Sequence, residues 1–347
     1  MRIEQLTFTR FIAAIAIVVF HFGRESQLFS NDYVDFIFNN ANVGVSYFFV
    51  LSGFVMIIAY CEKNLSFFDY LKNRFARIYP VYILAIILWL VGKTLHDINK
   101  VDLFLNVTML QSWFSERAQT INYPGWSLSV ELFFYVSFPF LLNYIYNKKS
   151  LKAITIVILG FWLISQLLYH AIIYNRFSVP IYTVNDIFYH PIMHFNEFLI
   201  GNLTGLYFLK KNVVQYNKNY LPHLVLLFLF LLVLLKFKIG LNFHNGLLAI
   251  VFVPIIYLLS CSKDMISKII SKKPFVFLGE ISYSIYILQV PIWLFLTDYR
   301  LKKYFGLNED LEITLAFMVR LFILIVFSSF CYLYIEKPLR KKIKFYF

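Results

Sequence analysis

Hydrophobic residues in this chain gather into long uninterrupted runs and seldom alternate with polar residues. A run of about twenty apolar residues predicts a helix that crosses a lipid bilayer. We therefore predict an all-α, polytopic membrane protein with about ten transmembrane helices. The predicted spans are 6–22, 42–61, 80–96, 126–146, 153–174, 188–208, 221–237, 244–260, 276–297 and 311–335.

One further segment, 103–115, is apolar but is interrupted by Asn106, Thr108 and Gln111. We predict an interfacial or re-entrant piece there. If this segment crossed the membrane, every later loop would change sides and the basic loops would face outward. That consequence favours ten spans over eleven.

The distribution of positive charge predicts the orientation. With the N-terminus placed in the cytoplasm, the inside segments hold twenty Lys and Arg residues and the outside segments hold eight. Cytoplasmic loops carry such an excess, so we expect both termini to be cytoplasmic. The formal net charge of +13 is then mainly a topology signal. We expect the lipid bilayer as a partner and no nucleic acid, since no soluble basic face is evident.

Composition agrees with this class of protein. The chain is 60% hydrophobic and only 15% charged, whereas soluble domains are roughly half apolar and a quarter charged. We expect a single transmembrane domain over residues 1–347, with the first span retained and no fused extracytoplasmic domain. The cysteines Cys61, Cys261 and Cys331 predict neither a disulfide framework nor a zinc site.

Two ionisable residues lie within the first predicted span, Arg10 and His21. They are eleven residues apart, so on a helix they share one face to within about 20° and are separated by roughly 16 Å. Taken singly, Arg10 could be a cation that snorkels to lipid phosphate, and His21 an interfacial histidine. Their placement on one face favours a functional site.

Three more charged residues are candidates for the same site. Arg74 and Arg77 are i and i+3 on a predicted inside loop, where they could bind phosphate groups or serve as positive-inside anchors. Glu131 lies about one turn inside a predicted span. A buried carboxylate there needs a partner or carries a proton, although it could also favour the helix dipole.

A rival signal comes from His190, His194 and Glu197, which have the i, i+4, i+7 spacing of metal ligands. Histidines of this kind more often hydrogen-bond between helices, and no other pattern supports a metal, so we expect none. Gly201 and Gly205 follow with the spacing of a close helix contact.

The motif formed by Arg10 and His21, Arg-x10-His, resembles that of the acyltransferase-3 family of membrane acyltransferases. The resemblance extends along most of the chain. Its motifs are LTFTRFIAAIAIVVFHF (6–22), GVSYFFVLSGFVM (44–56), RFARIYPVYIL (74–84), WSLSVELFFY (126–135), FNEFLIGNLTG (195–205), ISYSIYILQVP (281–291) and EKPLRK (336–341).

The chain departs from the family pattern at four positions. Ser46 replaces a frequent Asp or Gln, and Leu132 and Phe133 replace a frequent Glu-Gln pair. Gln289 stands where the late Ser-Tyr motif commonly ends in His. A role for that late histidine therefore has no counterpart here.

The resemblance implies an O-acyltransferase of the bacterial inner (cytoplasmic) membrane. The implied donor is cytoplasmic acyl-CoA, usually acetyl-CoA, and the implied acceptor is a glycan or lipid-linked glycan such as O-antigen, capsule or exopolysaccharide. It implies a catalytic role for His21 and Arg10, donor binding by Arg74 and Arg77, and a role for Glu131. Arg10 would also lie near the donor, and Glu131 could fix the His21 tautomer.

Two readings from other classes remain open. A transporter or flippase for a lipid-linked sugar also explains ten helices and buried charges, although no pair of broken helices is evident. A metal-dependent membrane hydrolase would use His190, His194 and Glu197. Within the acyltransferase reading, direct transfer and an acyl-histidine intermediate are both compatible with the sequence.

Overall fold

The computed structural model describes residues 3–93, 98–174, 184–210, 219–237, 239–305 and 313–346. These residues form helices and connecting turns, with no strand among them, which confirms the all-α prediction for this part of the chain. The helices of thirteen residues or more are α1 (Glu4–Phe22), α3 (Val43–Tyr60), α4 (Phe67–Gly92), α6 (Trp126–Phe140), α7 (Leu151–Ile173), α9 (Pro191–Lys210), α10 (Leu221–Lys236), α11 (Ala249–Cys261), α13 (Lys273–Phe295) and α15 (Ile313–Cys331).

Shorter elements connect these helices. They are α2 (Asp35–Asn39), α5 (Lys100–Val107), η2 (Gln111–Trp113), η3 (Ser115–Arg117), η4 (Tyr123–Gly125), η5 (Leu141–Tyr146), α8 (Val184–Tyr189), η7 (His244–Gly246), α12 (Met265–Ile270), α14 (Asp298–Phe305), η8 (Tyr332–Glu336) and α16 (Lys337–Tyr346). Segment 103–115 accordingly forms the end of α5 and η2, which are too short to cross a bilayer.

Each predicted span overlaps a helix in the described ranges, and seven of the described helices are long and apolar enough to cross a membrane. The other three predicted spans correspond to α9 and to the shorter apolar helices α10 and α11. The protein is therefore a multi-pass membrane protein by helix length and composition. The third predicted span was drawn too short, because α4 begins at Phe67 rather than at residue 80. The Ser66 side chain caps its first turn by accepting a hydrogen bond from the Asp69 N–H.

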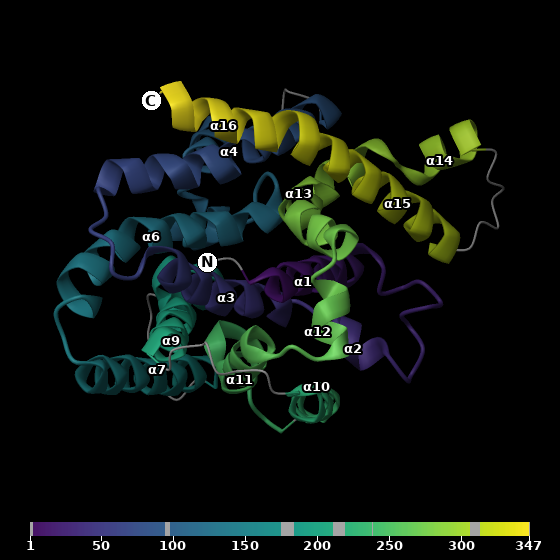
Figure 1. The fold of residues 1–347 in the computed structure, drawn as a ribbon. Coiled ribbons are helices and arrows are strands. Elements are labelled where there is room, and N and C mark those ends of the chain that lie inside the picture. Colours follow the sequence, from purple (N-terminus) through teal and green to yellow (C-terminus); the bar gives the residue numbers. More distant parts are fainter. Residues whose placement is uncertain are drawn as a thin grey trace.

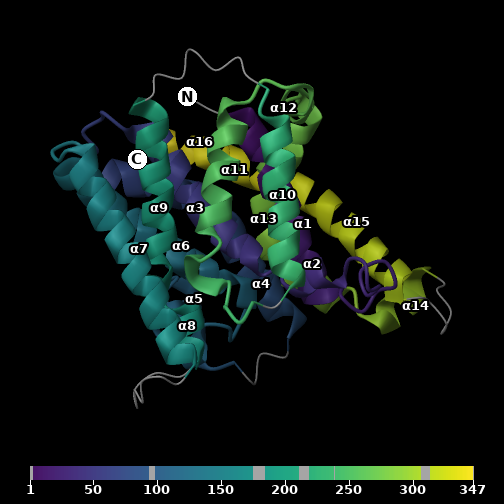
Figure 2. The same cartoon turned by 90° about the horizontal axis from the view of Figure 1, so that it is seen from below.

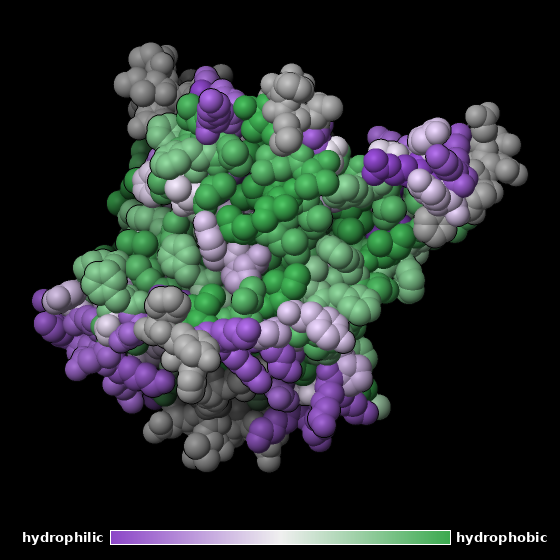
Figure 3. Space-filling model, turned by 90° about the horizontal axis from the view of Figure 1, so that it is seen from above, coloured by the Kyte–Doolittle hydropathy of each residue, from purple (hydrophilic) through white to green (hydrophobic). Residues whose placement is uncertain are grey.

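The outer surface of the bundle is apolar. Figure 3 shows a broad hydrophobic area with hydrophilic residues gathered at its margins. On α7 and α10 large apolar side chains point outward, and Val157 and Leu226 are 69% and 66% exposed. Such a surface would promote aggregation in water, whereas lipid tails cover it at no cost.

The two ends of the bundle carry different connections. Figure 2 places the N-terminus, α12 and α16 toward one end, and α2, α5, α8 and α14 toward the other. The described elements from loops predicted to be inside, α12 and α16, therefore lie at the opposite end from α2, α5, α8 and α14, which belong to loops predicted to be outside.

Helix α1 occupies the centre of the bundle. Figure 1 shows it beside α3 and α13, with α15 and α16 on one side and α10 and α11 on the other. It packs most extensively on α13. A Cβ at Gly279 of α13 would lie 1.9 Å from the Thr7 carbonyl oxygen of α1, so only glycine allows the two backbones this close. The motif residues of α1 are therefore held by a rigid neighbour.

The predicted close contact at Gly201 is confirmed, and its partner is α3. A Cβ at Gly201 would lie 2.0 Å from the Val50 carbonyl oxygen, and a Cβ at Gly53 would lie 2.1 Å from the Phe198 carbonyl oxygen. Each helix thus presents a glycine to the backbone of the other. Small residues at this contact let the two helices gain dispersion energy that side chains would block.

We expect Gly201→Ala to destabilise the protein by about 1–3 kcal/mol, because the added methyl group must push α3 and α9 apart. The measurement is the unfolding temperature of the purified protein in detergent micelles. Gly160→Ala on α7 is the matched control, since its Cβ would meet nothing within 4 Å. Equal unfolding temperatures for the two variants would contradict this account of the contact.

Candidate functional site

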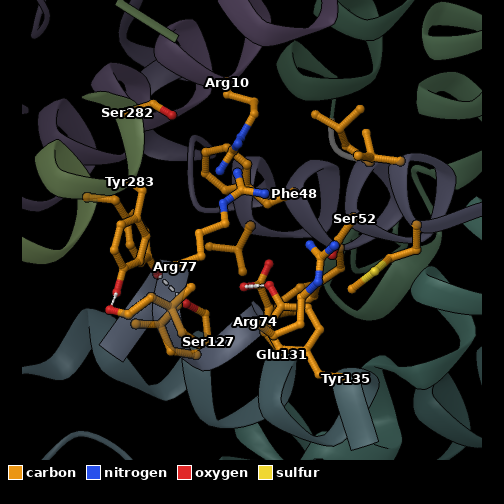
Figure 4. Close-up of a pocket in the computed structure, with 18 residues that line it drawn as sticks. Arg10, Phe48, Ser52, Arg74, Arg77, Ser127, Glu131, Tyr135, Ser282 and Tyr283 are labelled. Carbon is orange, nitrogen blue, oxygen red and sulfur yellow. Dashed lines mark hydrogen bonds between the residues drawn. The ribbon is translucent and has the colours of Figure 1, made fainter. Parts of the chain in front are cut away.

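A cavity of about 100 Å³ lies between α1, α3, α4, α6 and α13, and we call it the deep cavity. Its polar lining comes from the arginines, the carboxylate and the hydroxyls that the sequence motifs contributed. The labelled residues in Figure 4 are Arg10, Phe48, Ser52, Arg74, Arg77, Ser127, Glu131, Tyr135, Ser282 and Tyr283. Residues from five helices, far apart in the sequence, thus meet in one place.

A second cavity of about 360 Å³, the mouth cavity, lies next to the deep cavity. Its lining includes Ile3 and Arg340, so it lies at the end of the bundle that carries both termini. Arg10, Arg74 and Arg77 line both cavities and stand at the boundary between them. Of Arg10, His21, Arg74 and Arg77, the structure therefore brings the three arginines together.

The guanidinium groups of two of these arginines are available to a ligand. Within the described ranges, Arg10 and Arg77 make no hydrogen bond or ion pair with a protein group. Figure 4 shows both side chains reaching into the middle of the deep cavity. The charge of Arg10 is repelled by that of Arg77 and attracted by those of Glu131 and Glu336. Two guanidinium groups facing each other across a cavity form a strong site for an anion.

The third arginine, Arg74, is fixed by tyrosines. Its Nη2 donates a hydrogen bond to the Tyr60 hydroxyl at 2.6 Å. Its guanidinium carbon lies 5.1, 5.4 and 5.9 Å from the ring centroids of Tyr60, Tyr70 and Tyr135. The Nε atom is buried without a hydrogen-bond partner. Cation–π contacts hold the charge in place while leaving N–H groups available to a ligand.

Glu131 lies in the deep cavity but does not contact His21. Its Oε2 accepts a hydrogen bond from the Tyr135 hydroxyl at 2.8 Å, one turn along α6. Its surroundings are the charges of Arg10, Arg77 and Arg74. The suggestion that Glu131 fixes the His21 tautomer is therefore wrong in this structure, and Glu131 instead partly balances the arginines.

His21 lies in the last turn of α1 and lines a separate cavity of about 550 Å³, the His21 cavity. Its Nδ1 is hydrogen-bonded to the Gln289 Oε1 at 2.8 Å. Beside it, the rings of Phe22 and Trp293 stack with centroids 4.4 Å apart. Arg24 and Arg320 add positive charge to the same cavity. The His21 cavity therefore combines an imidazole, aromatic rings and positive charge.

Two further ionisable residues of the membrane helices, Arg320 and Glu280, have hydrogen-bond partners. Arg320 donates hydrogen bonds to the Leu296 carbonyl oxygen at 2.7 Å and to Asp298 at 2.6 Å. Glu280 accepts a hydrogen bond from the Tyr332 hydroxyl at 2.8 Å and lines the mouth cavity.

One turn of α13 joins the deep cavity to the His21 cavity. Tyr286 lines the deep cavity, and its hydroxyl is hydrogen-bonded to Ser127 Oγ at 2.9 Å and to the Pro124 carbonyl oxygen at 3.0 Å. Its own carbonyl oxygen accepts a hydrogen bond from Gln289, which holds His21. Tyr286 and Gln289 therefore link the lining of the deep cavity to His21 by hydrogen bonds.

The metal-ligand spacing does not produce a ligand set. His194 Nδ1 lies 2.8 Å from Glu197 Oε2, and its Nε2 lies 2.8 Å from the Phe188 carbonyl oxygen, so both ring nitrogens are engaged. The His190 ring packs at 5.2 Å against Trp113. Within the described ranges, no group of three His, Cys, Asp or Glu residues could hold a metal ion. The three residues instead hold α8 and α9 to their neighbours.

Sequence reasoning missed Gln289 as the partner of His21, and it gave no role to Glu336 and Arg340 at the mouth cavity. The signals were available in part. Gln289 is the position at which the late motif departs from the family pattern, and EKPLRK had been noted as a motif without a function.

Comparison with known proteins gives a family match over most of the chain. The Acyl_transf_3 family model, described as an acyltransferase domain, matches residues 3–335. The acyltransferase MdmB of Streptomyces mycarofaciens is 34% identical over 152 residues, which cover 40% of this chain and 39% of the relative. The O-acetyltransferase OatA of Staphylococcus aureus is 20% identical over 370 residues, 96% of this chain and 56% of the relative.

The chain thus spans about two fifths of the first relative and just over half of the second. No solved structure is similar enough to match.

Proposed function

The chain belongs to the acyltransferase-3 family of membrane acyltransferases, and on that premise we propose that it is an integral membrane O-acyltransferase. It moves an acetyl or other small acyl group from cytoplasmic acyl-CoA to a hydroxyl of a surface glycan such as O-antigen, capsule or exopolysaccharide. The family assignment made from the motifs is confirmed, and the donor and acceptor are the proposed part.

The main support for the proposal is the pair of guanidinium groups of Arg10 and Arg77, which line both the deep cavity and the mouth cavity. Arg10 and Arg77 have no protein hydrogen bond within the described ranges, and Arg340 adds charge at the mouth. A pyrophosphate and a 3′-phosphate would use these donors. The residues present therefore fit the nucleotide end of coenzyme A.

The lining of the deep cavity suits the flexible arm of coenzyme A. Besides the arginines, its lining includes the apolar side chains of Val45, Phe48 and Phe49 and the ring of Tyr286. The arm of coenzyme A is long and weakly polar, so it suits this mixed lining.

The chemistry of transfer falls to His21. Neutral Nε2 accepts the proton of the acceptor hydroxyl as that oxygen bonds to the thioester carbonyl carbon. The carbon–sulfur bond breaks, and the imidazolium returns the proton to the departing thiolate. In the variant route Nε2 itself bonds to the thioester carbonyl carbon and coenzyme A leaves as its thiolate. The acceptor hydroxyl then attacks the acyl-imidazole, Nε2 leaves, and the hydroxyl proton passes to the thiolate. Incubation with labelled acetyl-CoA and no acceptor distinguishes the routes, since only the second leaves label on His21.

The proposal includes the topology that the chemistry needs. Ten spans with both termini in the cytoplasm put the mouth cavity on the donor side and the His21 cavity on the outer side of a bacterial inner membrane. The excess of Lys and Arg in the predicted inside loops supports this orientation. So does the position of α12 and α16, which belong to two of those loops, at one end of the bundle.

The test uses proteoliposomes that contain the purified protein and the host's own glycan acceptor. We expect label from acetyl-CoA to appear as O-acetyl groups on the glycan, detected by NMR at a defined hydroxyl. Transport of a lipid-linked sugar without any acetyl-CoA-dependent product would instead support the transporter reading.

A further inference from the structure

A short chain of hydrogen bonds leads from the backbone of α13 to the imidazole of His21. Gln289 is fully buried. Its Nε2 donates to the Tyr286 carbonyl oxygen at 2.6 Å, and its Oε1 lies 2.8 Å from His21 Nδ1. The side chain of Gln289 therefore bridges a backbone group and the imidazole.

The direction of each bond in this chain is fixed by the one before it. A backbone carbonyl oxygen can only accept, so the Gln289 group that faces Tyr286 must be its NH₂. The other end of the amide is then the oxygen, which also can only accept. His21 Nδ1 must consequently carry the hydrogen in this bond. A neutral imidazole has one N–H, so the lone pair is left on Nε2.

Tyr286, where this chain of hydrogen bonds begins, is itself fixed by hydrogen bonds. The Tyr286 hydroxyl is hydrogen-bonded to Ser127 and to the Pro124 carbonyl oxygen. Further along α13, Pro291 lacks an N–H and leaves the Ile287 carbonyl oxygen without its helical partner. Asn122 Nδ2 donates to that oxygen at 2.9 Å. The helix is thus tied to residues 122–127 at two successive positions just before Gln289, Tyr286 and Ile287.

The other nitrogen of His21 is free to act. Within the described part of the chain no protein group is hydrogen-bonded to Nε2, and the ring lines the His21 cavity. This is the position that an acceptor hydroxyl would occupy under the proposed function.

We propose that Gln289 is a positioning residue that holds His21 as the Nδ1–H tautomer, so that Nε2 is presented to the acceptor hydroxyl as the base. The catalytic half of this statement rests on the proposed function. The tautomer half rests only on the hydrogen-bond chain and can be measured by itself.

The kinetic test compares Gln289→Met with Gln289→His. Methionine has a similar shape but breaks the chain, so we expect kcat to fall about 10- to 100-fold, part of what a positioned base contributes. KM for acetyl-CoA should stay near the wild-type value, because Gln289 does not line the donor cavities. Histidine can donate to Tyr286 with one nitrogen and accept from His21 with the other, so it should recover most of the rate.

Gln166→Met is the matched control for a buried amide. Gln166 Nε2 also donates to a backbone carbonyl oxygen, that of Asn245 at 2.8 Å, and Gln166 lines none of the three cavities. We expect its kcat to equal that of the wild type. Unfolding temperatures in micelles check that all variants are folded.

The second readout is the tautomer itself, seen by NMR of ¹⁵N-histidine-labelled protein, with the His21 signals assigned by their loss in His21→Ala. We expect Nδ1–H in the wild type and in Gln289→His, and a mixture in Gln289→Met. An Nε2–H tautomer in the wild type would overturn the proposal, as would an unchanged kcat in Gln289→Met. If the wild type transferred no acyl group but showed the expected tautomers, the positioning role would stand and the proposed function would fail.

Discussion

Replacing His21 by alanine is expected to lower the rate of O-acyl transfer by at least about 10²- to 10⁴-fold, the range that a positioned general base contributes. The fold should survive. The His21 ring faces a cavity, and Gln289 is its hydrogen-bond partner within the described residues. A route through acyl-histidine would be abolished altogether by the same change. The measurement is the O-acetyl content of the host glycan by NMR, with membrane levels of the protein matched.

His223→Ala is the control for this substitution. His223 lies near the start of α10, is exposed, and lines none of the three cavities. We expect it to leave acyl transfer unchanged. Full O-acylation by His21→Ala would show that the base, or the acyl carrier, is another group, and the mechanism proposed here would then be wrong.

Hydropathy located the helices well because lipid imposes a simple rule on length and polarity. Hydropathy gave the wrong helix boundary where a helix extends beyond its apolar part through a stretch that contains charged residues. Lys72, Arg74 and Arg77 suggested a loop before residue 80, yet they belong to α4. Arg74 and Arg77 face internal cavities rather than lipid. A hydropathy sum does not record the direction in which a side chain points, so the start of α4 was misplaced by more than three turns.

The ends of helices also depend on the conformational preferences of single residues, which an average of hydropathy over a window does not record. The predicted span 188–208 contains the break between α8 and α9, which falls just before Pro191. Proline is favoured in the first turn of a helix and disfavours helical geometry in the residue before it. That signal was present in the sequence and would have placed the boundary correctly.

The residues of the candidate site could be predicted from the sequence, but their positions relative to one another could not. Arg10, Arg74, Arg77 and Glu131 were selected from the cost of charge in lipid and from motifs, and the structure brings them to one cavity. His21 lines a separate cavity and is linked to Tyr286 through Gln289. The partner of His21 is 268 positions away in the sequence. Such pairing depends on which helices become neighbours, which no local pattern determines.

The second large effect on acyl transfer is expected from replacing Arg10, because of the position of this residue between two cavities. Arg10 lines both the deep cavity and the mouth cavity, and its guanidinium has no protein hydrogen bond within the described ranges. A bidentate pair with phosphate makes two charge-assisted bonds. Each is worth about 1.5–3 kcal/mol. We therefore expect Arg10→Met to lower kcat/KM for acetyl-CoA by about 10²- to 10⁴-fold, since every 1.4 kcal/mol is a factor of ten.

Arg10→Lys separates charge from geometry. Lysine keeps the positive charge but offers a single ammonium in place of a planar fork, so it should recover only part of the loss. Arg117→Met is the control, because Arg117 pairs with Asp102 at 2.5 Å and lines none of the three cavities. The measurements are the dissociation constant of coenzyme A in micelles and KM for acetyl-CoA. If Arg10→Met bound coenzyme A like the wild type and lost only kcat, Arg10 would act at the reacting thioester, and the phosphate site would belong to Arg74, Arg77 and Arg340 alone.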